Sequence, residues 1–140
     1  MQGKENGDGF IALKLDDGED LMESLRNAIK QFNISSGFVT MGIGMLKNVE
    51  IGYFNGMSYN KKLLEKPHEL ISLQGSISTM GEVIIHLHCS LANDKHEIIG
   101  GHLTGATVCV LNEILIKKTD NIVLGRNLNP ETGLKELFIN

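Results

Sequence analysis

Two histidines, His86 and His88, are the residues of this sequence best placed to do chemistry together. They lie in the segment Val83–Leu91, where apolar residues alternate with polar or small ones, a pattern typical of a β-strand. Because alternate residues of a strand share a face, both imidazoles are expected on one side, about 6.5–7 Å apart at the backbone. Such a pair can converge on a metal ion such as zinc, which binds histidine nitrogen at about 2.0–2.1 Å.

A metal site of this kind needs a third ligand, and the sequence offers two candidates. His102 follows two glycines, residues 100–101, where the lack of side chains lets another backbone approach closely. His96 lies nearer along the chain, beyond a turn. The alternative is that His86 and His88 form only the polar face of a half-buried strand. The residues by themselves leave both interpretations open, a metal site completed by a third histidine and a merely polar strand face.

A carboxylate within an apolar segment, Glu113, is a further candidate for chemistry. It lies in Val108–Ile116, and a charged group in such a segment needs a partner or access to solvent. Two interpretations stay open. Glu113 acts at the histidine site, as a base or as the partner of a ligating histidine, or it lies exposed at a sheet edge.

Composition and charge limit the classes of function. The chain has 140 residues and a net charge of −4, and Arg26 and Arg126 are its only arginines. It therefore lacks the basic character of a protein that holds nucleic-acid phosphates. The sequence Gly42-Ile43-Gly44 is followed by Lys47 where a dinucleotide-binding fingerprint needs glycine, so these glycines instead predict a bend in a strand.

The compartment is expected to be the cytoplasm. The N-terminal sequence MQGKENGDGF has no apolar region of a signal peptide, and no segment reaches about 18 continuous apolar residues. Cys89 and Cys109 both lie in apolar segments, which indicates buried thiols in a reducing environment rather than a disulfide.

Hydrophobic periodicity predicts the elements that position these residues. One amphipathic helix is expected over residues 18–33, from apolar residues at helical spacing. The rest of the chain alternates as strands, with a hairpin turn at Asn55-Gly56. The predicted fold is α+β, a single compact domain with one main helix on a mostly antiparallel sheet of about six or seven strands. We expect a flexible N-terminus at residues 1–9 and the domain at 10–140.

Taken in order, several segments of the chain resemble the plant-and-prokaryote conserved (PPC) domain, in the form found alone in prokaryotes. The resemblance covers about residues 8–139, nearly the whole chain. The segments that carry it are Gly18–Leu21, Gly42–Gly44, Glu69–Gly75, His86–His88, Gly100–Leu103 and Glu113–Ile114.

The resemblance implies a compact α+β subunit that assembles as a homotrimer, with a shared metal site at His86, His88 and His102. It also implies a DNA-binding or regulatory function, the usual label of the family. The AT-hook that accompanies the domain in plants is absent, and Gly125-Arg126-Asn127 is its nearest fragment. We therefore expect zinc or another divalent metal, with DNA as a partner by family label. The alternative is a small metal-dependent enzyme or metabolite-binding protein that uses the same histidines.

The trimer also has a physical rationale in the sequence. The apolar segments 83–91 and 106–116 are longer than one helix can cover, and the edge strands of a small open sheet need to be covered. Packing between subunits would bury the remaining apolar surface.

Overall fold

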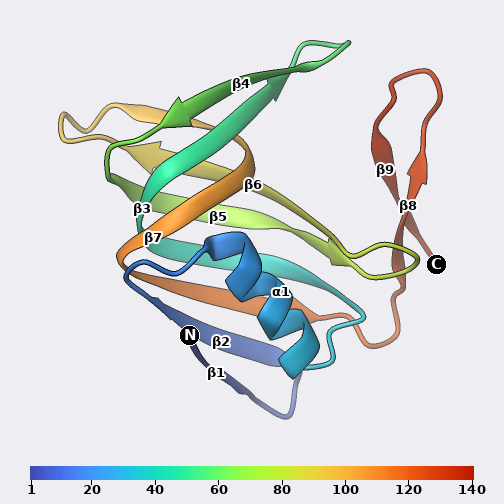
Figure 1. Ribbon diagram of the computed structural model, residues 1–140. Helices are drawn as coiled ribbons and strands as arrows, with labels where there is room; N and C mark the ends of the chain where they lie inside the picture. The colour runs from blue at the N-terminus through green and yellow to red at the C-terminus, as the bar shows by residue number, and fades with distance from the viewer.

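The computed structural model describes residues 1–140 as one helix, a seven-stranded sheet and a separate two-stranded hairpin (Figure 1). Every strand pairing is antiparallel, which confirms the predicted α+β class and the expected number of strands. The elements are β1 (Gln2–Glu5), β2 (Phe10–Asp16), α1 (Leu21–Gln31), β3 (Ser36–Phe54), β4 (Tyr59–Leu64), β5 (His68–Ser78), β6 (Ile84–Ala92), β7 (Ile98–Lys118), β8 (Leu124–Leu128) and β9 (Lys135–Ile139).

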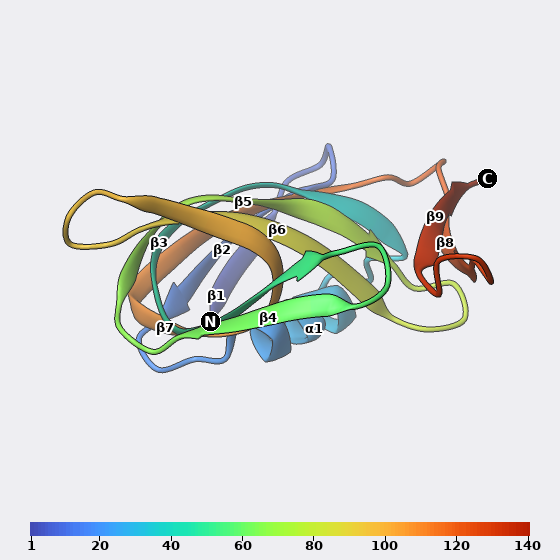
Figure 2. The same ribbon diagram turned by 90° about the horizontal axis from the view of Figure 1, so that it is seen from above.

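The sheet curves because two long strands, β3 and β7, each take part in several pairings. The strand order is β1-β2-β7-β6-β5-β3-β4, and β3 also pairs with β7. This extra pairing closes a ring through β7, β6, β5 and β3, and Figure 2 shows these strands curving around a common interior. The first part of β7 pairs with β6 and its later part with β2.

The bend predicted at residues 42–44 is present in β3. The pairing of β3 with β7 shifts register between Val39 and Met41 and again between Gly44 and Leu46. Gly44 has φ +138°, a backbone conformation that favours glycine. A Cβ at Gly44 would lie 2.2 Å from the carbonyl oxygen of Leu111, so glycine also permits the close approach of β7.

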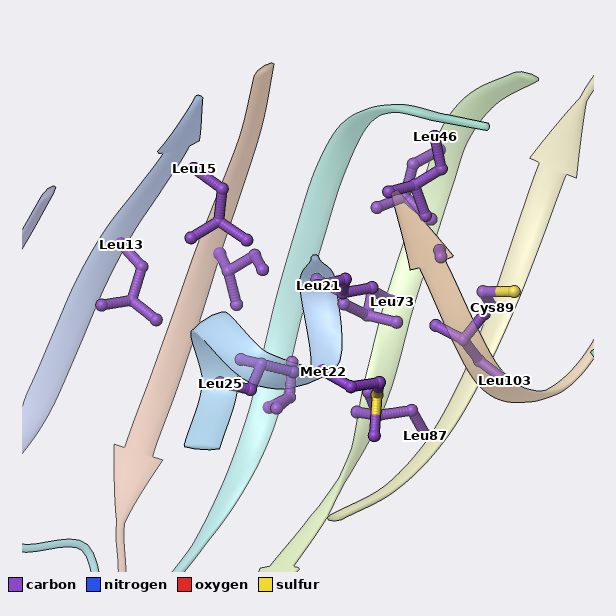
Figure 3. Close-up of a cluster of buried hydrophobic side chains, with 14 of the residues drawn as sticks. Leu13, Leu15, Leu21, Met22, Leu25, Leu46, Leu73, Leu87, Cys89 and Leu103 are labelled. Atoms are coloured by element: carbon purple, nitrogen blue, oxygen red, sulfur yellow. The ribbon is translucent and has the colours of Figure 1, made fainter. Parts of the chain in front are cut away.

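Helix α1 is shorter than the predicted span of 18–33, because its ends are set by capping. The side chain of Asp20 accepts a hydrogen bond from the backbone N–H of Glu23 at 2.8 Å, which is a typical N-cap contact. The helix turns its apolar face to the sheet. Its Leu21, Met22 and Leu25 join sheet residues such as Leu73 and Leu87 in one core of 24 buried residues (Figure 3).

The two ends of the chain both form strands. Within residues 1–9, the expected flexible N-terminus, Gln2–Glu5 form β1 and pair with β2. At the other end, β8 and β9 form a hairpin that stands beside the main sheet in Figure 1. No helix of the chain is long and apolar enough to cross a membrane.

Candidate metal centre

The structure brings His86, His88 and His102 together where β6 and β7 pair. His88 lies directly opposite His102 in the register of the two strands, and His86 is two residues along on the same face of β6. The three ring centroids are 5.0–5.5 Å apart. One ring nitrogen from each histidine lies within 4.8 Å of the others. His86 and His102 are partly buried and His88 is exposed, so the group opens to solvent on one side.

Two glycines allow the strands around β6 to approach closely enough to form this group. A Cβ at Gly100 of β7 would lie 2.2 Å from the carbonyl oxygen of Cys89. A Cβ at Gly75 of β5 would lie 1.9 Å from the carbonyl oxygen of His86. Real Cβ atoms do not approach so near, so any other residue would push these strands apart. The close approach expected at residues 100–101 is therefore confirmed.

The other candidate residues lie elsewhere. His96 is an exposed turn residue with φ +62°, outside the histidine group. Glu113 is also exposed, eleven residues beyond His102 on β7, and it lines a different cleft together with Met41. It does not lie at a sheet edge, because β7 is paired there with Lys14 of β2 and with β3. The structure brings Glu113 neither to the histidines nor to a sheet edge.

Burial favours the neutral form of two of the three imidazoles. Desolvation, together with electrostatic repulsion from the neighbouring His102, Arg126 and His88 side chains, lowers the pKa of His86 to about 4. Desolvation and the neighbouring His88 lower the pKa of His102 as well. Neutral imidazole is the form that binds a metal, so these two side chains need to lose no proton at neutral pH.

The donor set fits a metal ion such as zinc. Imidazole nitrogens suit zinc, copper, iron and nickel. Around a tetrahedral zinc they would lie about 3.3–3.4 Å apart, so small side-chain rotations from the present separations within 4.8 Å would bring them to bonding distance. The Nδ1 atom of His102 is buried without a hydrogen-bond partner, and such an orphaned nitrogen is one that a metal or a ligand could satisfy.

A residue from the C-terminal hairpin, Arg126 of β8, completes the surroundings of the histidines. Its Nη2 donates a hydrogen bond to Ser76 Oγ at 2.6 Å and lies 3.4 Å from His86 Nδ1. Its Nη1 donates to the backbone carbonyl of Lys135 at 3.2 Å. From the sequence, Arg126 entered only the charge count and the nearest fragment of an AT-hook, and nothing placed it beside the histidines. The one available signal was that it is one of two arginines in the chain.

His86, His88 and Arg126 open on a cleft of about 740 Å³. Apolar walls and neutral polar groups share its lining, which comprises Phe38, Val39, Thr40, Gln74, Gly75, Ser76, His86, His88, Arg126 and Leu137. A second cleft, of about 520 Å³, shares His86, Arg126 and Leu137 and also reaches His102. Tyr59 lies at this second side, with its ring centroid 5.0 Å from that of His102.

Comparison with known proteins identifies one family. Residues 2–120 match the Plants and Prokaryotes Conserved (PCC) domain, which is the PPC domain by another abbreviation. Two curated relatives, the bifunctional GlmU proteins of two Synechococcus strains, are 29% identical over 128 residues. That match covers 91% of this chain but only 20% of each relative, so the chain spans about a fifth of their length.

Solved structures share the whole fold. A PPC protein from Pyrococcus horikoshii is 30% identical with a TM-score of 0.80, over 96% of this chain and 94% of that one. A metal-containing protein from Archaeoglobus fulgidus is 26% identical with a TM-score of 0.82, over 99% of both chains. A protein from Bacteroides thetaiotaomicron, whose name assigns it provisionally to DNA binding, is 24% identical with a TM-score of 0.90. The match covers 98% of this chain and 96% of the Bacteroides thetaiotaomicron chain.

Proposed function

This chain belongs to the Plants and Prokaryotes Conserved domain family, and we propose that it is a metal-binding member in which His86, His88 and His102 hold a divalent ion. The observation that carries the proposal is the convergence of three imidazoles from two paired strands, with ligand atoms within 4.8 Å of one another. The name of the Archaeoglobus fulgidus relative, a metal-containing protein, gives independent support. Zinc is the ion that we favour, because it commonly accepts three histidines.

Three protein ligands leave a tetrahedral zinc one position for water or another ligand, where the ion can polarise a carbonyl or lower the pKa of a bound water. The protein's own residues set the conditions for this chemistry. His86 and His102 are held neutral by burial, while the exposed His88 leaves the site open to solvent. The site thus combines the features of a ligand-accessible metal centre rather than those of a closed structural one.

The metal proposal predicts stoichiometric binding that depends on these three side chains. Protein purified without a histidine tag and dialysed against zinc should contain about one ion per chain by elemental analysis. His102→Ala should weaken zinc binding by about 100-fold or more, beyond the 10–100-fold typical of losing an outer partner of a ligand. The matched control is His96→Asn, which replaces an exposed histidine outside the group at a positive φ that asparagine tolerates.

Either of two results would exclude this function. The first is a wild-type protein that holds no zinc, copper, nickel, iron or manganese after each is supplied. The second is a His102→Ala variant that binds zinc as tightly as His96→Asn does.

DNA binding is the second candidate, and the names of relatives are its support. The Bacteroides thetaiotaomicron protein carries such a name, but at 24% identity the likeness shows the fold alone. The charge of this chain favours the metal proposal, because a net charge of −4 and two arginines supply little attraction for phosphates. Duplex DNA is therefore the alternative ligand, and its binding at the histidine site is tested together with that of small anions.

A further inference from the structure

Arg126 is a cation without a counter-ion beside the histidine group. None of the six ion pairs in the structure includes it, so no carboxylate oxygen lies within 4.0 Å of its guanidinium nitrogens. Its side-chain contacts are all with neutral groups, the hydroxyl of Ser76, the ring of His86 and the backbone carbonyl of Lys135. Its Nε is buried without a hydrogen-bond partner. A partly buried guanidinium with these contacts has donor capacity to spare.

Metal binding at His86 would add a second hydrogen-bond donor beside Arg126 and so increase the need for an acceptor there. A histidine that binds a metal through one ring nitrogen carries a proton on the other, and that N–H is usually donated to a carboxylate, a carbonyl or water. At His86, Nδ1 lies 3.4 Å from Arg126 Nη2. A guanidinium has five donors and no acceptor, so it cannot accept this proton. An oxygen atom placed between the two side chains would accept from both.

The cleft beside Arg126 offers no acidic side chain for this role. The lining of the cleft of about 740 Å³ includes no aspartate or glutamate. The second cleft contains Glu136, but this carboxylate already accepts a hydrogen bond from Asn129 Nδ2 at 2.7 Å. Lys135, which also lines the second cleft, forms an ion pair with Glu82. Although the chain as a whole is acidic, the lining of the cleft of about 740 Å³ therefore comprises one unpaired cation and neutral groups.

We propose that this cleft binds a small organic oxyanion, a carboxylate or a phosphate ester, whose charged group lies between the metal position and Arg126. The proposal rests on the metal-binding function inferred above and names the ligand class of the same site. Guanidinium matches the planar geometry of carboxylate and the oxygens of phosphate through paired N–H donors. Ser76 and the Lys135 carbonyl hold Arg126 toward the cleft, so little side-chain freedom is lost on binding.

The same cleft also defines the rest of the ligand. Phe38, Val39 and Leu137 supply an apolar wall, whereas Thr40 and Gln74 supply neutral hydrogen-bonding groups. A compact apolar body next to the charged group suits this lining. A nucleic-acid backbone suits it less well, because repeated phosphates need several cations and this site has one unpaired arginine.

The test uses zinc-loaded wild-type protein and three probes that share a benzene ring: benzoate, phenyl phosphate and neutral benzyl alcohol. Isothermal titration calorimetry at neutral pH and fixed salt should show binding of benzoate, phenyl phosphate or both, at least tenfold tighter than benzyl alcohol. The separate benzoate and phenyl phosphate arms show which oxyanion is preferred. Arg126→Gln, which keeps a hydrogen-bonding amide but removes the charge, should weaken anion binding at least tenfold. Its zinc content should match that of the wild type.

The chain supplies a matched control in its other arginine. Arg26→Gln removes the same charge from the exposed face of α1 and should leave both zinc content and anion affinity unchanged. If Arg126→Gln does not fold, the comparison of anionic and neutral probes in the wild type still decides the question.

The outcomes separate the two proposals. Wild-type protein that binds zinc but does not distinguish the anions from benzyl alcohol overturns the anion site and leaves the metal function standing. The same holds if folded Arg126→Gln binds the anions as the wild type does, or if duplex DNA binds through Arg126 while both small anions fail. A wild type that binds no metal overturns both proposals.

Discussion

At the scale of single residues, the pattern of the sequence located the metal-binding candidates but not the group beside them. Strand alternation placed His86 and His88 on one face, and the glycines before His102 indicated a close strand approach, so all three could be found from local signals. Arg126 comes from a hairpin forty residues beyond His86, and no periodicity connects the two. The expected role of Glu113 at the histidine site failed for the same reason. Strand alternation gives the face of a side chain, but it does not show that Glu113 and His102 lie at different ends of β7.

The lowered pKa of His86 predicts how the stability of metal-free protein depends on pH. The unfolded chain takes up a proton at His86 below its ordinary pKa of 6.5, whereas the folded protein does not until about pH 4. The free energy of unfolding should therefore fall as the pH falls from about 6.5 to about 4, and His86 should contribute no change above that window. Urea denaturation of chelator-treated protein measures this slope.

His86→Gln removes the titrating group and should flatten the slope between these pH values. His96→Asn removes an exposed histidine outside the group and should keep the wild-type slope. Equal slopes for wild type and His86→Gln would show that burial does not hold His86 neutral in the folded protein.

At the scale of elements, the class and approximate positions of helix and strands followed from hydrophobic periodicity, whereas their ends followed from local contacts. Helix α1 begins at Leu21 because Asp20 caps it. From the sequence alone the first residue of the helix was not fixed, because several acidic residues near this end could have been the N-cap. Strand β1 was missed because Gln2–Glu5 are polar, and they form a strand only because β2 offers a free edge to pair with. The extra pairing of β3 with β7 is a long-range contact that no local pattern contains.

Gly100 tests whether strand spacing positions the histidines. The alanine methyl of Gly100→Ala would meet the carbonyl oxygen of Cys89 at 2.2 Å, so β6 and β7 must separate opposite Ser90, two residues from where His88 faces His102. We expect unfolding free energy to fall by about 1–3 kcal/mol, as for other overpacked sites. Zinc affinity should also fall by at least tenfold, since ligand geometry is displaced. Urea denaturation and competition with a zinc indicator measure these two quantities.

Gly105 is a matched control on the same strand. A Cβ at Gly105 meets no atom within 4 Å and its φ is not positive, so Gly105→Ala should leave stability nearly unchanged and zinc affinity at the wild-type value. If Gly100→Ala binds zinc as Gly105→Ala does, close strand approach is not what places the histidines.

At the scale of the whole molecule, the single helix covers one face of the sheet. Apolar side chains stay exposed on the opposite, outer face of several strands. On β3 these include Met41 and Ile43, which are 42% and 41% exposed. Where such exposed apolar side chains adjoin one another, they mark an interaction site. A homotrimer, which the family resemblance implies, would bury such surface in head-to-tail contacts that close into a ring.

We therefore predict that light scattering coupled to size-exclusion chromatography will give a mass near 46.2 kDa, three times the 15.4 kDa of one chain. Met41→Asp places a charge on the outer face of β3 and should shift the mass toward that of a single chain, because burying an unpaired carboxylate at an interface is costly. Met57→Asp is the matched control, since Met57 is 90% exposed in the turn between β3 and β4 and should keep the trimer. A wild-type mass near 15.4 kDa would exclude the trimer. A trimer that survives Met41→Asp would move the interface away from this part of β3, to another of the exposed apolar faces.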